Sequence, residues 1–256
     1  MPLLLLTALF FIVAMAYSAV GFGGGSSYNA LLILSGMDYR LVPAIALSCN
    51  ILVVAGGVYH HARARTLSLE QLLPFILLSV PMAWLGGSLV ISEQVFIGLL
   101  GFSLLVAAMQ MMKKQRGTSM RHGFGKTQYW LISTGLGAGI GLLAGITGIG
   151  GGIFLAPLIY LLKLAPARTV AGLTSGFILV NSAAGLAGQM MKAGDWSPLA
   201  GWVGAWPLFI VVVLGGQIGS RLGAYRLPEV WIKRLTAILI LYVALRLIWR
   251  WAGMTI

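Results

Sequence analysis

Eight apolar segments, most of them about 20 residues long or longer, fill almost the whole chain and limit what it can fold into. They cover residues 2–35, 42–62, 72–91, 94–112, 128–162, 169–191, 198–222 and 230–251. A helix needs roughly 20 mostly apolar residues to cross about 30 Å of hydrocarbon. Only 9% of the residues are charged, whereas soluble domains carry about 25%. The sequence therefore predicts an all-α polytopic membrane protein.

The net charge of +12 is also found in nucleic-acid-binding proteins, but its distribution favours a membrane protein. Lysine and arginine cluster in the short loops between apolar segments, as the positive-inside rule requires. The expected surroundings are membrane lipid, not nucleic acid. The chain has one cysteine, Cys49, and its histidines (His60, His61 and His122) lie in charged loops. We expect no cofactor and no metal site.

Two segments, 2–35 and 128–162, are too long for one straight crossing, and each contains a glycine cluster. The clusters, residues 21–25 and 148–152, lie 127 positions apart. The same offset aligns further residues without a gap, namely Leu31 with Leu158, Ala44 with Ala171, Ser48 with Ser175, and 51–53 with 178–180. The sequence predicts a duplication, with a first transmembrane repeat at 1–115, a connecting loop at 116–127 and a second repeat at 128–256.

Loop charges favour a hairpin at each glycine cluster. If every long segment crosses once, ten basic residues lie on one side and seven on the other. If both broken segments enter and leave on one face, the distribution becomes thirteen against four, which fits the positive-inside rule better. Each half then has an odd number of crossings, so the halves are inverted repeats, a known transporter plan. We expect both termini outside and loop 113–126 in the cytoplasm.

The glycine breaks are the predicted substrate site. Glycine permits a sharp turn and a close approach of ligand to backbone. The helix after each break begins with unpaired N–H groups and the positive end of its dipole, which suits an anion. Two such ends can converge from the two halves. Alternatively, the glycines only permit close packing of helices.

The acidic residues favour an anion as substrate. All five stand at segment ends or in loops: Asp38, Glu70, Glu93, Asp195 and Glu229. Cation transporters and proton pumps generally need carboxylates within the membrane. Hydroxyl, amide and glycine N–H groups can hold a small anion without a buried countercharge.

The candidate binding residues lie at the breaks and in the segment after each break. At the breaks they are Gly23, Gly24, Gly25, Ser26, Asn29, Thr147, Gly150, Gly151 and Gly152. In the following segments they are Ser48, Cys49, Asn50, Thr174, Ser175 and Asn181. With the offset of 127 positions, Asn181 aligns with Val54, which lies four residues after Asn50 and therefore on the same helical face. Alternatively, hydroxyls bond their own helix, the asparagines join helices, and Cys49 is a small hydrophobe.

The chain resembles the sulfite exporter TauE/SafE family, also described as four-toluene-sulfonate uptake type permeases. The resemblance covers both halves and rests on residues 21–25 with Ala44 and Ser48, and on 145–152 with Pro157, Ala171, Thr174 and Ser175. It implies transport of sulfite, thiosulfate, sulfoacetate or other organosulfonates across a bacterial inner membrane, without ATP.

We therefore expect a secondary transporter that works by alternating access around the glycine-broken helices. A passive anion channel with the same site is the alternative. Export of an anion needs no coupling at a negative-inside potential, whereas uptake would need protons or sodium ions. We expect no enzyme, because a serine protease at Ser26 or Ser27 would need a histidine at membrane depth.

Overall fold

The computed structural model is all-helical in the part of the chain that it describes, namely residues 2–19, 21–112, 125–161, 167–192, 197–225 and 229–254. The helices are α1 (Leu3–Ser18), α2 (Gly25–Leu34), α3 (Val42–Arg63), α4 (Leu69–Ser88), α5 (Glu93–Met112), α6 (Lys126–Thr147), α7 (Gly152–Leu161), α8 (Ala167–Lys192), α9 (Ser197–Tyr225) and α10 (Glu229–Met254). The all-α prediction is confirmed for these residues. Most of the predicted connecting loop 116–127, with His122, lies outside the described residues, as does Asp195.

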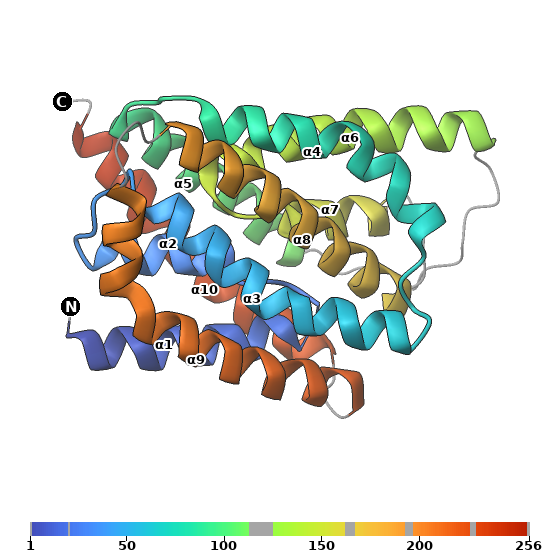
Figure 1. The fold of residues 1–256 in the computed structure, drawn as a ribbon, viewed down its shortest axis with the longest axis horizontal. Coiled ribbons are helices and arrows are strands. Elements are labelled where there is room, and N and C mark those ends of the chain that lie inside the picture. The colour runs from blue at the N-terminus through green and yellow to red at the C-terminus, as the bar shows by residue number, and fades with distance from the viewer. Residues whose placement is uncertain are drawn as a thin grey trace.

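Each overlong apolar segment forms two helices. Segment 2–35 becomes α1 and α2, and segment 128–162 becomes α6 and α7, with the glycine clusters between them. In Figure 1, α1 starts at the left end and α2 returns toward it, whereas α6 starts at the right end and α7 returns toward that end. Eight apolar segments therefore correspond to ten helices in the described residues, because each glycine cluster ends one helix and begins another.

The contacts between helices follow the same pattern in both halves. Helix α4 packs against α6 and α8, and α9 packs against α1 and α3. Helix α2 packs against α3, as α7 does against α8. The remaining large contacts join α3 to α8 and α5 to α10. In these contacts, each helix from α1 to α5 thus has the same neighbours as the helix five places later, with the halves exchanged.

Glycines bring the backbones of α4 and α6 close together. Gly137, Gly141 and Gly145 recur every four residues on α6, so they share one face of the helix. A Cβ atom at any of them would overlap a backbone carbonyl oxygen of α4. Tight contact through small residues is a common way for membrane helices to associate. On the same interface, the Thr134 hydroxyl donates to the Pro74 carbonyl oxygen at 3.0 Å.

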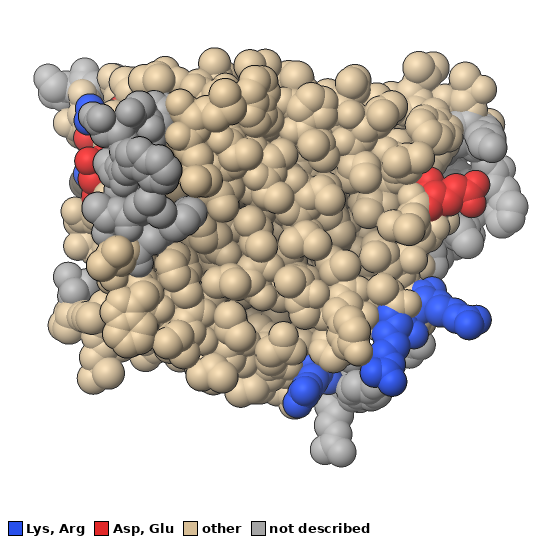
Figure 2. Space-filling model, viewed as in Figure 1, with Lys and Arg blue, Asp and Glu red and all other residues tan. Residues whose placement is uncertain are grey.

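The outer surface suits lipid. Among the described residues, five helical stretches are long and apolar enough to cross a membrane, namely Val42–Arg63, Leu69–Ser88, Thr127–Thr147, Thr169–Met191 and Val203–Leu222. Charged side chains on the face in Figure 2 gather at its two ends, and the wide band between them is uncharged. Large apolar side chains are exposed, including Leu4 and Trp249, each 83% exposed. Such a surface would be a liability in water but matches a hydrocarbon environment.

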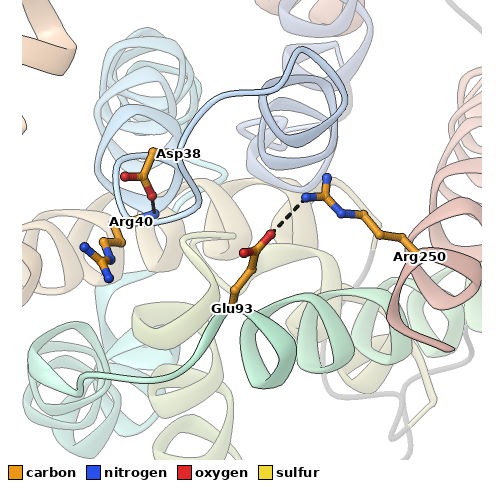
Figure 3. A network of polar contacts seen from close by, with 4 residues as sticks. All are labelled: Asp38, Arg40, Glu93 and Arg250. Carbon is orange, nitrogen blue, oxygen red and sulfur yellow. Dashed lines mark hydrogen bonds and ion pairs between the residues drawn. The ribbon is translucent and has the colours of Figure 1, made fainter. Parts of the chain in front are cut away.

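One end of the molecule carries an ion pair between the two halves, drawn in Figure 3. The Arg250 guanidinium on α10 donates to the Glu93 carboxylate in the first turn of α5, at 2.9 Å. Nearby, the Asp38 carboxylate accepts from the Arg40 backbone N–H at 2.9 Å. Glu93 also lies at the N-terminus of α5, where a negative charge interacts favourably with the positive end of the helix dipole. Both partners of the ion pair are more than one third exposed, so its contribution to stability is small.

Candidate functional site

The first break ends α1 with a left-handed glycine. The Phe22 N–H donates to the Tyr17 carbonyl oxygen at 2.9 Å, and Gly21 between them has φ +80°. This is the hydrogen bond of a Schellman motif, which needs a residue at positive φ. Gly24, at φ +90°, then precedes α2 and accepts hydrogen bonds from the Ser27 and Tyr28 N–H groups. The glycine cluster therefore stops one helix and starts the next within a few residues.

The second break has positive φ at the two counterpart glycines, but its hydrogen bonds differ from those of the first break. Gly148, the counterpart of Gly21, has φ +72° and donates to the Ala144 carbonyl oxygen at 2.9 Å. Gly151, the counterpart of Gly24, has φ +80° and accepts from the first turn of α7. Gly150 differs from its counterpart in also having a positive φ. The glycines are thus required for turning as well as for close packing.

Each break packs against a long helix of the other half: the first break against α8, and the second break against α3. A Cβ atom at Gly21 would lie 2.8 Å from the Ala171 carbonyl oxygen of α8, and one at Gly148 would lie 2.6 Å from the Pro43 Cα of α3. The Ser175 hydroxyl of α8 donates to the Gly21 carbonyl oxygen at 2.8 Å. The breaks therefore lie where the two halves meet.

Two asparagines of the first half bind the backbone of the second break. The Asn29 amide donates to the Thr147 carbonyl oxygen at 2.8 Å, and the Asn50 amide donates to the Ile149 carbonyl oxygen at 3.0 Å. A break in a buried helix leaves carbonyl groups without their usual partners, and these two amides supply partners. In the second half, the repeat-related residues are Ala156 and Phe177, so this arrangement has no mirror on the first break.

Asn50 lies between the two breaks. A Cβ atom built on Gly23, Gly25 or Gly150 would overlap its amide group, at 2.8 Å from Nδ2 in the case of Gly150. Asn50 is completely buried. Only glycine therefore fits at these three positions while Asn50 holds this place. The structure brings the start of α2 and the second break, at Ile149 and Gly150, together around a single neutral amide.

Several polar atoms near the breaks have no hydrogen-bond partner among the described residues. They are the side-chain oxygens of Tyr28, Asn29, Asn50 and Ser182, and all four residues are completely buried. The Tyr28 hydroxyl lies 3.0 Å from the Cβ position of Gly24. The Ser182 hydroxyl lies 2.8 Å from the Cβ position of Gly150. Buried polar atoms are usually paired, so these atoms are available for a ligand or for a partner in another conformation.

Several other predicted residues hydrogen-bond within their own helices. The Thr147 and Thr174 hydroxyls each donate to a carbonyl oxygen one turn earlier on the same helix, as do the Ser48 hydroxyl and the Asn181 amide. This is the alternative role that such side chains often have. The Thr174 hydroxyl also lies 3.5 Å from the Gly21 carbonyl oxygen of the first break. Cys49 is completely buried. Gly152 at the start of α7 meets the side chain of Ile178.

Ser26 is directed toward α1. Tyr17 of α1 places its hydroxyl 2.9 Å from the Ser27 hydroxyl and 3.3 Å from that of Ser26. The rings of Phe10 and Tyr28 stack with their centroids 4.7 Å apart. These contacts fix α2 against α1 rather than lining the space at Asn50.

Sequence reasoning missed two buried polar residues of α8. Ser182 follows Asn181, but the predicted repeat pairs it with Ala55, so the predicted duplication gives no signal for it. Gln189 donates to the Gly145 carbonyl oxygen at 3.1 Å and joins α8 to α6. A polar side chain deep in an apolar segment was the available signal for both residues.

The centre carries no charged side chain. Every buried polar residue in the described part of the chain is a serine, threonine, asparagine or glutamine. The same part contains no group of three or more His, Cys, Asp or Glu side chains that could hold a metal ion. Electrostatically, the centre consists of neutral dipoles and the positive ends of α2 and α7. Such a centre can hold a small anion through N–H and O–H donors.

Comparison with known proteins gives one family. The family model described as sulfite exporter TauE/SafE matches residues 6–247. A probable membrane transporter protein of Sinorhizobium fredii is 34% identical over 241 residues, covering 94% of this chain and 96% of that protein. A probable membrane transporter protein of Methanocaldococcus jannaschii is 26% identical over 196 residues, covering 73% of this chain and 71% of that protein. No solved structure matches the chain.

Proposed function

Because the chain belongs to the sulfite exporter TauE/SafE family, we propose that it is a secondary transporter of small sulfur-containing anions such as sulfite, thiosulfate, sulfoacetate or other organosulfonates. The observation that carries this proposal is the meeting of two glycine-broken helices at Asn50 in a buried, uncharged centre. Helix starts attract anions, and the absence of a buried carboxylate among the described residues disfavours a cation.

Helix packing supports two inverted repeats. Helices α1 to α5 have the same neighbours as α6 to α10, and α1 and α6 start from opposite ends of the molecule (Figure 1). Two copies related by an axis in the membrane plane would have both properties. In this arrangement α2 and α7 are the inner parts of re-entrant hairpins, one entering from each face of the membrane.

The closed centre supports alternating access. Each break lies against a helix of the other half, and all the candidate residues except Ser48 are buried. A rocking motion of one half against the other would separate Gly21 from Ala171 on one side, or Gly148 from Pro43 on the other. Each separation would open the centre toward one face of the membrane. A channel would instead need both openings at once.

Charge distribution supports an orientation with both termini outside the cell. Helix α3 ends with Arg63 and α6 begins at the same end of the molecule, immediately after the loop 113–126 with its five basic residues (Figure 1). The positive-inside rule places this end in the cytoplasm of a bacterial-type inner membrane. The membrane potential favours export of an anion by about 2.3 kcal/mol per charge per 100 mV, so export requires no coupling ion. Uptake would require protons or sodium ions.

The proposal assigns no catalytic step. Ser26 and Ser27 hydrogen-bond to Tyr17, and no histidine is among the buried residues in the described part of the chain. A nucleophile without a base nearby is not activated.

The experiment that tests the proposal is flux of labelled sulfite and thiosulfate into liposomes that contain the purified protein. We expect saturable flux that is accelerated by anion on the far side and unaffected by competing cations. Flux that never saturates and shows no counterflow would support the channel instead. A complete lack of flux for sulfur oxyanions and sulfonates would contradict the substrate class.

A further inference from the structure

The two broken helices bring about one positive charge to the centre. The N-terminus of a helix carries the equivalent of about +0.5 elementary charge, and α2 and α7 both begin at the breaks that meet Asn50. The buried side chains of the described residues are all uncharged. A singly charged anion would therefore be balanced, whereas a doubly charged anion would keep about one uncompensated charge in a medium where such a charge is costly.

The nitrogen and the oxygen of the Asn50 amide lie against different parts of the breaks. Its nitrogen donates to the Ile149 carbonyl oxygen at 3.0 Å, and only the nitrogen of an amide can donate. The oxygen is therefore directed toward Gly23, where a Cβ atom would overlap it. This oxygen has no partner among the described residues and is completely buried.

An unpartnered acceptor selects for a donor on the ligand. The oxygens of a fully ionised oxyanion only accept hydrogen bonds, so they would be repelled by the Asn50 oxygen. An anion with an O–H or N–H group can donate to that oxygen and accept from the N–H groups at the starts of α2 and α7. The Ser182 hydroxyl, also unpartnered, lies beside Gly150 and can donate or accept.

We propose that the site selects a singly charged anion that carries its own hydrogen-bond donor. Among the sulfur anions proposed above, hydrogen sulfite is then the preferred substrate, and the doubly charged sulfite, thiosulfate and sulfoacetate are disfavoured. The inference rests on the proposed transport function and specifies the charge and protonation state of its substrate. Each molecule carried moves one negative charge and one proton that can dissociate after release. No covalent change takes place.

The test uses proteoliposomes with the full chain and measures sulfur flux, internal pH and charge movement at several values of external pH. Above the pH at which hydrogen sulfite ionises, the initial rate at constant total sulfite should fall about tenfold per pH unit, following the hydrogen sulfite concentration. At constant hydrogen sulfite, a higher sulfite dianion concentration, obtained by raising the pH and total sulfite together, should leave the rate unchanged, and so should added sulfate. One negative charge should move per sulfur atom, and the receiving compartment should become more acidic.

Two results would overturn the inference. A rate that follows the dianion, or two charges moved per sulfur atom, would overturn it and leave the proposed transport function intact. A lack of flux for every sulfur anion would overturn both.

The variant Asn50→Ala distinguishes a hydrogen bond from the ligand to the Asn50 oxygen from a merely structural role of Asn50. In the wild type, hydrogen sulfite should compete better than methanesulfonate, a singly charged anion without a donor. In Asn50→Ala this preference should fall about tenfold, as expected for a lost hydrogen bond to a charged ligand. An equal loss for both anions would assign Asn50 a structural role and contradict the inference. Gly135→Ala, at a position with open space around it, is the control for reconstitution.

Discussion

The side-chain nitrogen of Asn50 lies 3.0 Å from the carbonyl oxygen of Ile149, a residue 99 positions further along the chain. This hydrogen bond joins the middle of α3 to the second break and fixes the amide against glycines of both breaks. It ties the two halves together at the point where their backbones are irregular. Several consequences can be measured.

Removal of this amide should lower stability as well as transport. Asn50→Ala leaves the Ile149 carbonyl oxygen buried without its partner, which costs about 1–3 kcal/mol. We expect a lower apparent unfolding temperature in detergent. Asn181→Ala is the comparison, because the Asn181 amide donates to a carbonyl oxygen of its own helix that the helix can itself satisfy. An equal loss in the two variants would contradict the importance of the link between the halves.

A methyl group at the start of α2 should strongly reduce transport. In Gly25→Ala the new Cβ atom would overlap the Asn50 amide and lie 2.8 Å from the Ile149 carbonyl oxygen, so Asn50 must move. We expect flux to fall at least about tenfold, as misplacement of binding groups commonly does. The same substitution at Gly135 meets nothing within 4 Å and should leave flux unchanged. Normal flux in Gly25→Ala would contradict the proposed site.

The α4–α6 interface should be sensitive to single methyl groups on one face of α6 alone. Gly141→Ala would push a Cβ atom into the Ser79 carbonyl oxygen, whereas Gly139→Ala, two residues earlier, meets open space. The first should destabilise by about 1–3 kcal/mol, the usual cost of overpacking. The second should be neutral or slightly stabilising, because alanine favours helix. Thermal unfolding of the two variants in the same detergent measures the difference.

The ion pair between Arg250 and Glu93 should matter little. Because both side chains are more than one third exposed, Glu93→Gln should cost less than about 1 kcal/mol, and less still at high salt. A double-mutant cycle with Arg250→Gln gives the coupling directly. A coupling of several kcal/mol would show that this end of the molecule is shielded from water.

The proposed orientation can be read from labelling of single cysteines. Cys49 is completely buried and should not react with a membrane-impermeant maleimide, so the natural chain provides a silent background. Arg40→Cys should be labelled from outside intact cells, and Arg65→Cys only after the membrane is opened. Labelling of both from outside would contradict the arrangement of the two ends, and the reverse pattern would contradict the orientation.

The sequence was sufficient for the helices and for the places where they break. The apolar segment 42–62 corresponds to α3 at Val42–Arg63, because a run of this length without charges has few alternatives to a helix. Glycines at 21–25 and 148–152 predicted both breaks, since they tolerate the positive φ found at Gly21, Gly24, Gly148 and Gly151.

Partners across the two halves could not be predicted from the sequence. The bond from Asn50 to Ile149 depends on how α3 packs against the second break, and periodicity within one helix contains no information about that packing. Hydrogen bonds from a side chain to the backbone of its own helix were easier to predict. Thr147 and Thr174 bond their own helices, as hydroxyls in apolar helices often do. Ser182 was missed because the predicted duplication pairs it with an alanine.

The two breaks are held by different side chains, and this difference has an energetic consequence. A transporter of two identical halves would have inward-open and outward-open states of equal free energy. Here the Asn29 and Asn50 amides bond two carbonyl oxygens of the second break, whereas the Ser175 and Thr174 hydroxyls both bond the single Gly21 carbonyl oxygen of the first. Opening at the second break therefore leaves two buried carbonyl oxygens without their amide donors, and opening at the first leaves one without its hydroxyl donors. In a protein that rocks about these breaks, the resting population is biased toward one face of the membrane before any substrate binds.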